Sequence, residues 1–240
     1  MLISIILPAY QEAKNLINII PVLIDVLKGM SVSYEILVID TMIPMDNTED
    51  VCRQFEHCFY IPRENGNAYG DAIRTGFAKS TGDYVVVMDA DGSHNPEDIA
   101  RFYKKISREN FDLIIGSRYC VGGSTDNGFI LRLMSRILNF SYKIMFGLKV
   151  NDVSDSFRMY KGIQVRELKL ECNNFDVVEE ILILLNYSIP KFKTFEIPIS
   201  FNKRVAGQSK RNLIRFIKSY LQTMYRLMRI KNRVIKRGKI

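Results

Sequence analysis

No hydrophobic run in the sequence reaches the roughly 18 apolar residues that a membrane-spanning helix needs. The best candidate, residues 137–148, is short and contains Lys143. The N-terminus also lacks the basic region that begins a signal peptide. We therefore expect no transmembrane segment and a cytoplasmic location.

Cysteines are few and do not form a pattern. Cys52, Cys58, Cys120 and Cys172 lack metal-site spacing, and a chain of 240 residues with 47% hydrophobic residues needs no disulfides to hold a core. There is no low-complexity tract and no internal repeat. These features exclude a small disulfide scaffold, a zinc module and a disordered chain.

Acidic residues are missing from the C-terminal end. After Glu196 there is no Asp or Glu, although the last 44 residues contain 13 Lys and Arg, so the formal net charge of +8 hides an acidic body and a basic tail. From Asn212 onward, apolar residues recur on one helical face and basic residues on the other. This pattern is typical of a helix in an anionic membrane interface. Packing of the apolar face on the rest of the protein is the alternative, and both can hold together.

Strand-like and helix-like segments alternate through residue 118. We predict strands at 2–7, 34–40, 59–61, 83–88, 111–115 and 192–201, and helices at 16–27, 48–55, 68–79, 96–107, 129–146 and 177–186. Pro21 within the first helix predicts a kink or a late start. The alternation indicates an α/β fold with a mainly parallel central sheet flanked by helices. We expect one domain at 1–210 and a basic amphipathic helix at 211–240.

A pair of carboxylates follows the clearest strand. Asp89 and Asp91 stand two residues apart, so both can point to one side and share a hard cation such as Mg²⁺ or Mn²⁺. The alternative is a surface turn in which the Asp side chains bond to their own backbone. His94 is interpreted as a polar residue at a helix entry rather than a phosphate ligand.

Several motifs occur in a fixed order along the chain. They are Pro8-Ala9-Tyr10-Gln11-Glu12, the Asp89 motif through Pro96, Gly116-Ser117-Arg118-Tyr119, Ser156-Phe157-Arg158, Pro198-Ile199-Ser200-Phe201 and Gly207-Gln208-Ser209-Lys210. As a set they resemble the polyprenyl-phosphate (dolichol-phosphate) mannose synthase branch of the family 2 glycosyltransferases. The resemblance covers residue 3 to about residue 225. It implies a GT-A fold and inverting, metal-dependent sugar transfer from a nucleotide-sugar, GDP-mannose by default, to a polyprenyl phosphate.

The resemblance also assigns residues to the site. The substrate-binding residues that it implies are Pro8, Tyr10, Glu12, Ile39, Asp40, Asp89, Ala90, Asp91, Ser93, Arg118, Arg132, Arg204 and Lys210. Among these it implies Asp89, Asp91 and Ser93 at the metal, and Asp91, Arg118 and Arg132 in catalysis. Ser135, Asp152, Ser156 and Glu180 fall in further family motifs. Many relatives carry C-terminal membrane spans, which this sequence lacks, so a separate membrane subunit is a further possible partner.

One segment departs from the family pattern. Relatives usually have a second Asp after the one that ends the second strand, but here Asp40 is followed by Thr41, and one residue is inserted before Asp46. Because this region faces the base or ribose, a UDP-sugar is an alternative donor.

The acceptor decides the catalytic chemistry. A lipid phosphate is already an anion near neutral pH and requires no general base, whereas a glycan hydroxyl requires a carboxylate base, for which Glu180 and Asp152 are candidates. A non-catalytic subunit of the same fold is a rival hypothesis. Nucleic-acid binding through the basic tail is disfavoured because no stacking platform or known module is evident.

Overall fold

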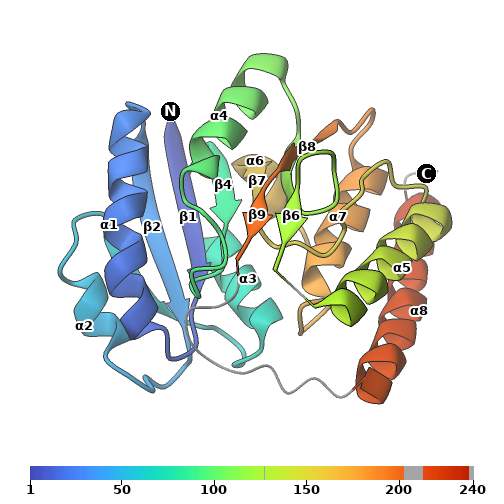
Figure 1. The fold of residues 1–240 in the computed structure, drawn as a ribbon, viewed down its shortest axis with the longest axis horizontal. Coiled ribbons are helices and arrows are strands. Elements are labelled where there is room, and N and C mark those ends of the chain that lie inside the picture. The colour runs from blue at the N-terminus through green and yellow to red at the C-terminus, as the bar shows by residue number, and fades with distance from the viewer. Residues whose placement is uncertain (127, 203–212, 238–240) are drawn as a thin grey trace.

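The computed structural model describes residues 1–126, 128–202 and 213–237, with the side chains of the last helix described over 221–236. At its centre lies a seven-stranded sheet in the order β3-β2-β1-β4-β7-β5-β8, and a two-stranded sheet β6-β9 lies beside it (Figure 1). The strands are β1 (Leu2–Pro8), β2 (Ser33–Asp40), β3 (Cys58–Pro62), β4 (Tyr84–Val87), β5 (Leu113–Ser117), β6 (Ser124–Thr125), β7 (Arg158–Lys161), β8 (Thr194–Pro198) and β9 (Ser200–Phe201).

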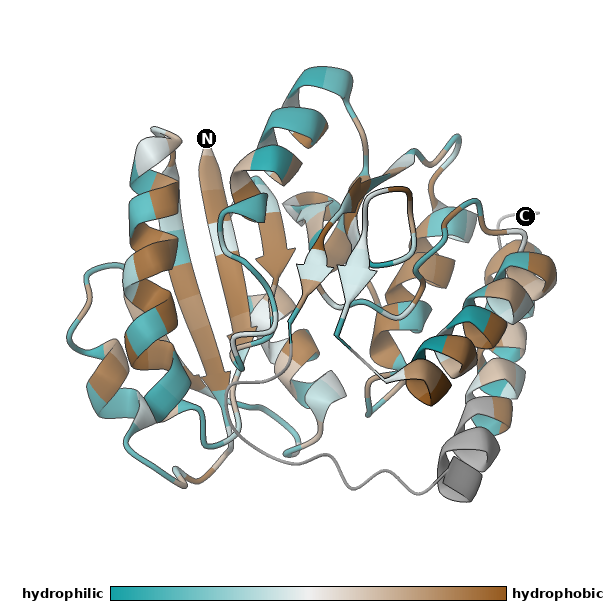
Figure 2. Ribbon diagram, in the orientation of Figure 1, coloured by the Kyte–Doolittle hydropathy of each residue, from teal (hydrophilic) through white to brown (hydrophobic). Residues whose placement is uncertain are grey.

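Helices cover both faces of the large sheet. They are α1 (Ala13–Gly29), α2 (Thr48–Cys52), α3 (Tyr69–Lys79), α4 (Asp98–Glu109), α5 (Phe129–Phe146), α6 (Gly162–Arg166), α7 (Val177–Ser188) and α8 (Leu213–Arg237). One core joins α1, α2 and α4 to the sheet, and the other joins α3, α5, α7 and α8 to its opposite face. In β1, Ile5 belongs to the first core and Ile6 to the second, as the alternation of side chains along a strand requires. Figure 2 shows the hydrophobic strands between these layers.

The predicted α/β architecture with a mainly parallel sheet is confirmed. The strand β7 is the main element that the sequence analysis missed. It runs antiparallel to both of its neighbours, β4 and β5. Its sequence includes Arg158, a residue type that is rarely fully buried, and this hides the strand in a search for apolar runs. The guanidinium of Arg158 is nevertheless wholly buried and donates to the carbonyls of Val153 (2.6 Å) and Val178 (2.8 Å).

Two helices differ in detail from the predictions. The helix α1 continues through Pro21 without a break. In α8, Leu227 and Ile230 are buried and the Thr223 hydroxyl donates to Asp176 on the loop before α7. Met228, expected on the same apolar face as Leu227, is instead exposed. The described part of α8 therefore packs on the protein, which was the alternative to membrane contact.

Among the described residues, no helix combines the length and the apolar composition required to span a bilayer.

Substitution of Leu227 tests whether α8 belongs to the core. We expect Leu227→Ala to lower the free energy of unfolding by about 2–5 kcal/mol, because it leaves a cavity between α8 and its neighbours. Leu221→Ala, on the exposed side of the same helix, should change it by less than about 0.5 kcal/mol. Urea denaturation measures both, and equal effects of the two substitutions would refute the packing.

Candidate active site

The carboxyl ends of the parallel strands β2, β1 and β4 lie side by side at one edge of the sheet. Pro8 at the end of β1 pairs with Ile39 in β2, and Ile6 pairs with Val87 in β4. Asp40 therefore leaves the sheet on one side of Pro8, and the segment after Val87 leaves it on the other. In open α/β sheets this edge is where ligands bind.

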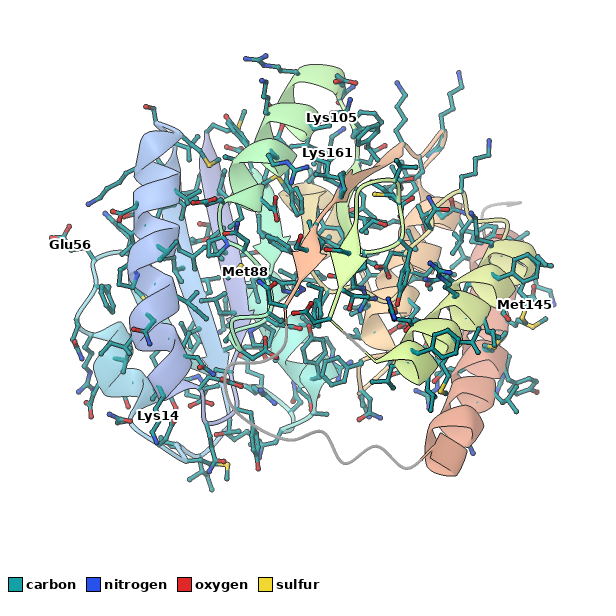
Figure 3. All side chains as sticks on the ribbon, in the orientation of Figure 1. Lys14, Glu56, Met88, Lys105, Met145 and Lys161 are labelled. Atoms are coloured by element: carbon teal, nitrogen blue, oxygen red, sulfur yellow. The ribbon has the colours of Figure 1, made fainter. Side chains whose placement is uncertain are left out.

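The acidic motif begins immediately after β4, beyond Met88, which Figure 3 labels. Asp91 is 6% exposed, and its Oδ1 accepts hydrogen bonds from the Ser93 backbone N–H (3.0 Å) and hydroxyl (2.6 Å). Gly92 makes the turn with a φ of 81°, a conformation that glycine adopts without steric cost. The motif is thus a turn in which an Asp side chain bonds to its own backbone, which was the alternative to a cation site. It lies at the sheet edge, however, and not on the open surface.

Asp89 lies in the same buried turn. Its Oδ1 accepts a hydrogen bond from the Tyr69 hydroxyl at 3.2 Å. Burial raises the pKa of Asp89, and the negative charges of Asp91 and Asp155 add to the rise, while His94 opposes it. Two neighbouring carboxylates that are largely shielded from water and repel each other are stabilised by a nearby cation.

A chain of buried charges joins the acidic motif to β5. The backbone N–H of Asp89 donates to His94 Nδ1 at 3.2 Å, and His94 Nε2 lies 3.2 Å from Asp155 Oδ1. Asp155 Oδ2 lies 3.1 Å from Arg118 Nε. Arg118 also binds Asp152 through two parallel contacts, Nε to Oδ2 (2.7 Å) and Nη2 to Oδ1 (2.8 Å). Each ionic group in this network of buried charges therefore has an oppositely charged or hydrogen-bonding neighbour.

His94 is more important to the site than the sequence analysis inferred. Its side chain is fully buried, its ring stacks on Phe157 with centroids 4.8 Å apart, and Phe201 meets it edge-on at 5.3 Å. The Asn202 backbone N–H donates to the Ser93 carbonyl at 3.0 Å. Burial alone would lower the pKa of His94, but Asp155 and the acidic motif raise it. Three sequence motifs that lie far apart in the chain thus meet at this ring.

The basic residues of the predicted site have different environments. The Arg118 side chain is only 9% exposed, and its fork is closed on Asp152 rather than open to a ligand. Arg132 lies in the first turn of α5 and is exposed. Arg204 and Lys210 lie outside the described residues, so their roles stay sequence-based predictions.

The predicted donor-binding residues lie near the ends of β1 and β2. Pro8, Ile39 and Ala90 are buried, whereas Tyr10 is 54% exposed. Glu12 is half-buried and accepts a hydrogen bond from the Asn15 side chain.

Asp40 is buried at the end of β2, where its nearest donors are the Thr41 backbone N–H and the Tyr60 hydroxyl. Neither of its carboxylate oxygens has a well-oriented hydrogen-bond partner in the described part of the chain. Burial raises the pKa of Asp40, and Arg63 opposes the rise. A buried carboxylate whose hydrogen bonds are poorly oriented is a candidate to accept hydrogen bonds from a bound ligand.

Arg63 is a site residue that the sequence analysis missed. It is 6% exposed and follows β3, where its guanidinium donates to the carbonyls of Ala9 and Asn67 and so ties the ends of β1 and β3 together. The signal in the sequence was a basic residue two positions after a short predicted strand, at the carboxyl edge of the sheet.

The segment that departs from the family pattern is held by its own contacts. The Thr41 hydroxyl donates to the Ile43 carbonyl at 2.7 Å. Asp46 accepts hydrogen bonds from the backbone N–H groups of Ala13 (3.1 Å) and Thr48 (3.0 Å), so it fixes the loop against the start of α1.

Solved structures share this fold. Glucosyl-3-phosphoglycerate synthase from Mycobacterium tuberculosis, in complex with Mn²⁺, uridine diphosphate and phosphoglyceric acid, matches with a TM-score of 0.70 and 18% identity over 92% of this chain and 75% of that one. A second structure of that enzyme, with Mg²⁺ and uridine diphosphate, matches with a TM-score of 0.69 and 17% identity over 94% and 78% of the two chains. The fold is therefore that of the GT-A glycosyltransferases.

Sequence comparisons identify the family. The model for glycosyl transferase family 2 matches residues 4–163. A dolichol-phosphate mannosyltransferase of Pyrococcus furiosus is 33% identical over 95% of this chain, which spans 64% of that protein's length. An undecaprenyl-phosphate mannosyltransferase of Micrococcus luteus is 30% identical over 88% of this chain and 87% of its own length. The chain belongs to glycosyl transferase family 2.

The buried ion pairs of Arg118 lead to a stability prediction. We expect Arg118→Ala to lower the free energy of unfolding by about 3–5 kcal/mol, because it leaves the carboxylates of Asp152 and Asp155 buried without their cation. Arg132→Ala, at an exposed position, should change it by less than about 0.5 kcal/mol. Guanidinium denaturation monitored by circular dichroism measures the difference. A variant lacking Arg118 that is as stable as the wild type would contradict the structural role.

Proposed function

We propose that this chain transfers a sugar, mannose as the leading candidate, from a nucleotide-sugar to a polyprenyl phosphate at a membrane surface. The observation that carries the proposal is the carboxylate pair at the carboxyl end of a central parallel strand, with Asp91 buried and Asp89 half-buried. Support also comes from the family membership and from the two relatives, whose names specify mannosyl transfer to dolichol phosphate and undecaprenyl phosphate.

The donor nucleotide would bind across the ends of β1 and β2. Tyr10 would supply exposed aromatic surface for the base or ribose, whereas the buried side chains of Pro8 and Ile39 would shape the site from beneath, and Glu12 lies close by in sequence. The unsatisfied oxygens of Asp40 would accept hydrogen bonds from N–H or O–H groups of the nucleotide. GDP-mannose is the proposed donor, with a UDP-sugar as the alternative because Thr41 replaces the usual second acid.

The carboxylate oxygens of Asp89 and Asp91 are ligands that suit a hard divalent cation. Within the described residues, no group of three or more His, Cys, Asp or Glu side chains is arranged to hold a metal. Two carboxylates suit Mg²⁺ or Mn²⁺ nonetheless, because such ions commonly complete their coordination with substrate phosphates and water. Ser93 would orient Asp91, since its hydroxyl already donates to that carboxylate. When bound, the cation supplies Lewis-acid stabilisation of the departing diphosphate.

The acceptor phosphate needs positive charge rather than a base. We propose Arg132, Arg204 and Lys210 as the groups that hold it, with Arg118 positioning the neighbouring Asp152 segment. The competing hydroxyl acceptor would need a free carboxylate. Glu180 accepts backbone N–H groups of Glu171 and Cys172, both at 2.8 Å, and Asp152 is engaged by Arg118. These contacts favour the phosphate acceptor.

A donor screen tests the proposed reaction. The purified chain is incubated with Mg²⁺ or Mn²⁺, a polyprenyl phosphate in detergent, and radiolabelled GDP-mannose or individual UDP-sugars. We expect label from GDP-mannose to pass into the organic phase, because the product is a glycolipid. In a parallel reaction that also contains a glycan acceptor, label that enters only the water-soluble glycan would refute the lipid acceptor. Absence of metal-dependent nucleotide binding would instead favour a non-catalytic subunit.

Replacement of Asp91 tests the cation site. We expect Asp91→Asn to lower the transfer rate by about 10²–10³-fold, because loss of one carboxylate weakens the stabilisation of the leaving group by several kcal/mol. Asp50→Asn, which removes an exposed carboxylate on α2, is the matched control and should retain wild-type turnover. Wild-type turnover by the Asp91 variant would refute the metal assignment.

A further inference from the structure

An apolar surface runs along the outer side of α5. Six large hydrophobic side chains of this helix are each between 47% and 71% exposed, and we call them the α5 stripe: Phe129, Ile130, Leu133, Ile137, Phe140 and Ile144. Intervals of three, four and seven residues place Leu133, Ile137, Phe140 and Ile144 on one helical face. Figure 2 shows the hydrophobic residues on the outer side of α5. A contiguous exposed patch of this kind marks an interaction site more often than a free surface.

The opposite face of α5 fixes the orientation of the stripe. Leu138, Tyr142 and Phe146 are buried in the core, and the Asn139 side chain accepts a hydrogen bond from the Val153 backbone N–H at 3.1 Å. Rotation of the helix to bury the stripe would expose these residues. The stripe therefore stays directed outward in the folded protein.

Basic side chains line one edge of the stripe. The helix contains Arg132, Arg136 and Lys143 and no Asp or Glu. Their spacing of four and seven residues places them in one row, between the exposed stripe and the buried face. An apolar face bordered by cations matches the boundary between acyl chains and anionic headgroups. Pairing with a second copy of the chain would bring apolar faces together but would also bring two rows of like charge close to each other.

The basic edge lies next to the segment that binds Arg118. Lys143 Nζ donates to the Asn151 side chain at 2.9 Å, and Asn139 holds Val153, so α5 contacts the residues on both sides of Asp152. At the far end of α5, which Figure 3 marks by Met145, the Lys231 ammonium of α8 donates to the Met145 carbonyl at 3.1 Å. The helix is thus fixed to the protein beside the buried charges of the active site.

We propose that α5 is the membrane-docking element of this protein, with the α5 stripe among the lipid acyl chains and the basic row at the level of anionic headgroups. The proposal rests on the proposed function, because a lipid-phosphate acceptor presents its reactive group at that level. It differs from the expectation for the C-terminal helix, since α8 directs Leu227 and Ile230 into the core.

Vesicle partitioning tests the proposal without reference to catalysis. The wild type, an α5 variant (Ile137→Ser with Phe140→Ser) and an α8 control (Leu221→Ser with Tyr225→Ser) are sedimented with phosphatidylcholine vesicles containing phosphatidylglycerol. All four side chains are more than half exposed, so each variant should fold, which circular dichroism and urea denaturation verify. We expect the vesicle–water partition coefficient of the α5 variant to be at least about tenfold lower than that of the wild type, because membrane affinity scales with buried apolar area. The α8 control should stay within about twofold.

The basic row has its own variant. Arg136→Gln should weaken binding to vesicles with phosphatidylglycerol by about fivefold, because one cation near an anionic surface contributes that much affinity, and it should leave binding to pure phosphatidylcholine unchanged.

Other outcomes would overturn the assignment. Unchanged partitioning of the α5 variant, or an equal loss in the α8 control, would refute docking through α5. Analytical ultracentrifugation tests self-association. If the wild type forms dimers, the α5 variant does not, and neither protein binds vesicles, the stripe is a dimer interface. A failure of the proposed function is distinguishable from a failure of docking. If the wild type binds vesicles but transfers no sugar to a short-chain, water-soluble polyprenyl phosphate, the proposed function is wrong and the docking proposal stands. The α5 variant should use that soluble acceptor at the wild-type rate.

Discussion

The ion pairs between Arg118 and the carboxylates of Asp152 and Asp155 are the interaction on which the rest of the site depends. Removing these charges from water costs several kcal/mol per ion, and only close, multiple contacts offset that cost. The bidentate geometry of Arg118 on Asp152 supplies such contacts. These pairs fix the end of β5 to the segment before β7, and through His94 they reach the backbone of Asp89. The position of the acidic motif is therefore determined by a network that extends across three strands.

The network also determines where negative charge gathers in the site. The network holds Asp89 and Asp91 close together in a buried turn, where burial and mutual repulsion raise the pKa of Asp89. The protein thus gathers the negative charges of Asp89 and Asp91 at the sheet edge where β2 ends in the buried carboxylate of Asp40. A cation would be attracted by the carboxylate pair and a nucleotide could donate to Asp40, and both features lie at the edge where open α/β sheets bind ligands. The basic row of α5 reaches the same network through Lys143, which donates to Asn151 beside Asp152.

Local patterns in the sequence were sufficient for the parallel part of the fold. Buried runs of β-branched residues that end in Pro8, Asp40 and Asp89 determine both the strands and the edge at which the site lies. The antiparallel strand β7 was not predictable in this way, because Arg158 interrupts its apolar pattern and its guanidinium is buried against carbonyls that the fold brings to it. The same limit applies to Arg118, since its partners at Asp152 and Asp155 lie more than 30 residues away and spacing alone does not reveal them. The periodicity of the C-terminal helix indicated an apolar face but could not identify which surface that face covers.

The central claim is that the buried pair at the end of β4 binds the cation that contacts a nucleoside diphosphate. Its most direct test is a crystal structure grown with Mn²⁺ and GDP, in which anomalous scattering locates the manganese. We expect a peak within coordination distance of carboxylate oxygens of Asp89 or Asp91 and of the diphosphate. A bound nucleotide whose manganese lies elsewhere, with both carboxylates turned away from it, would contradict the account.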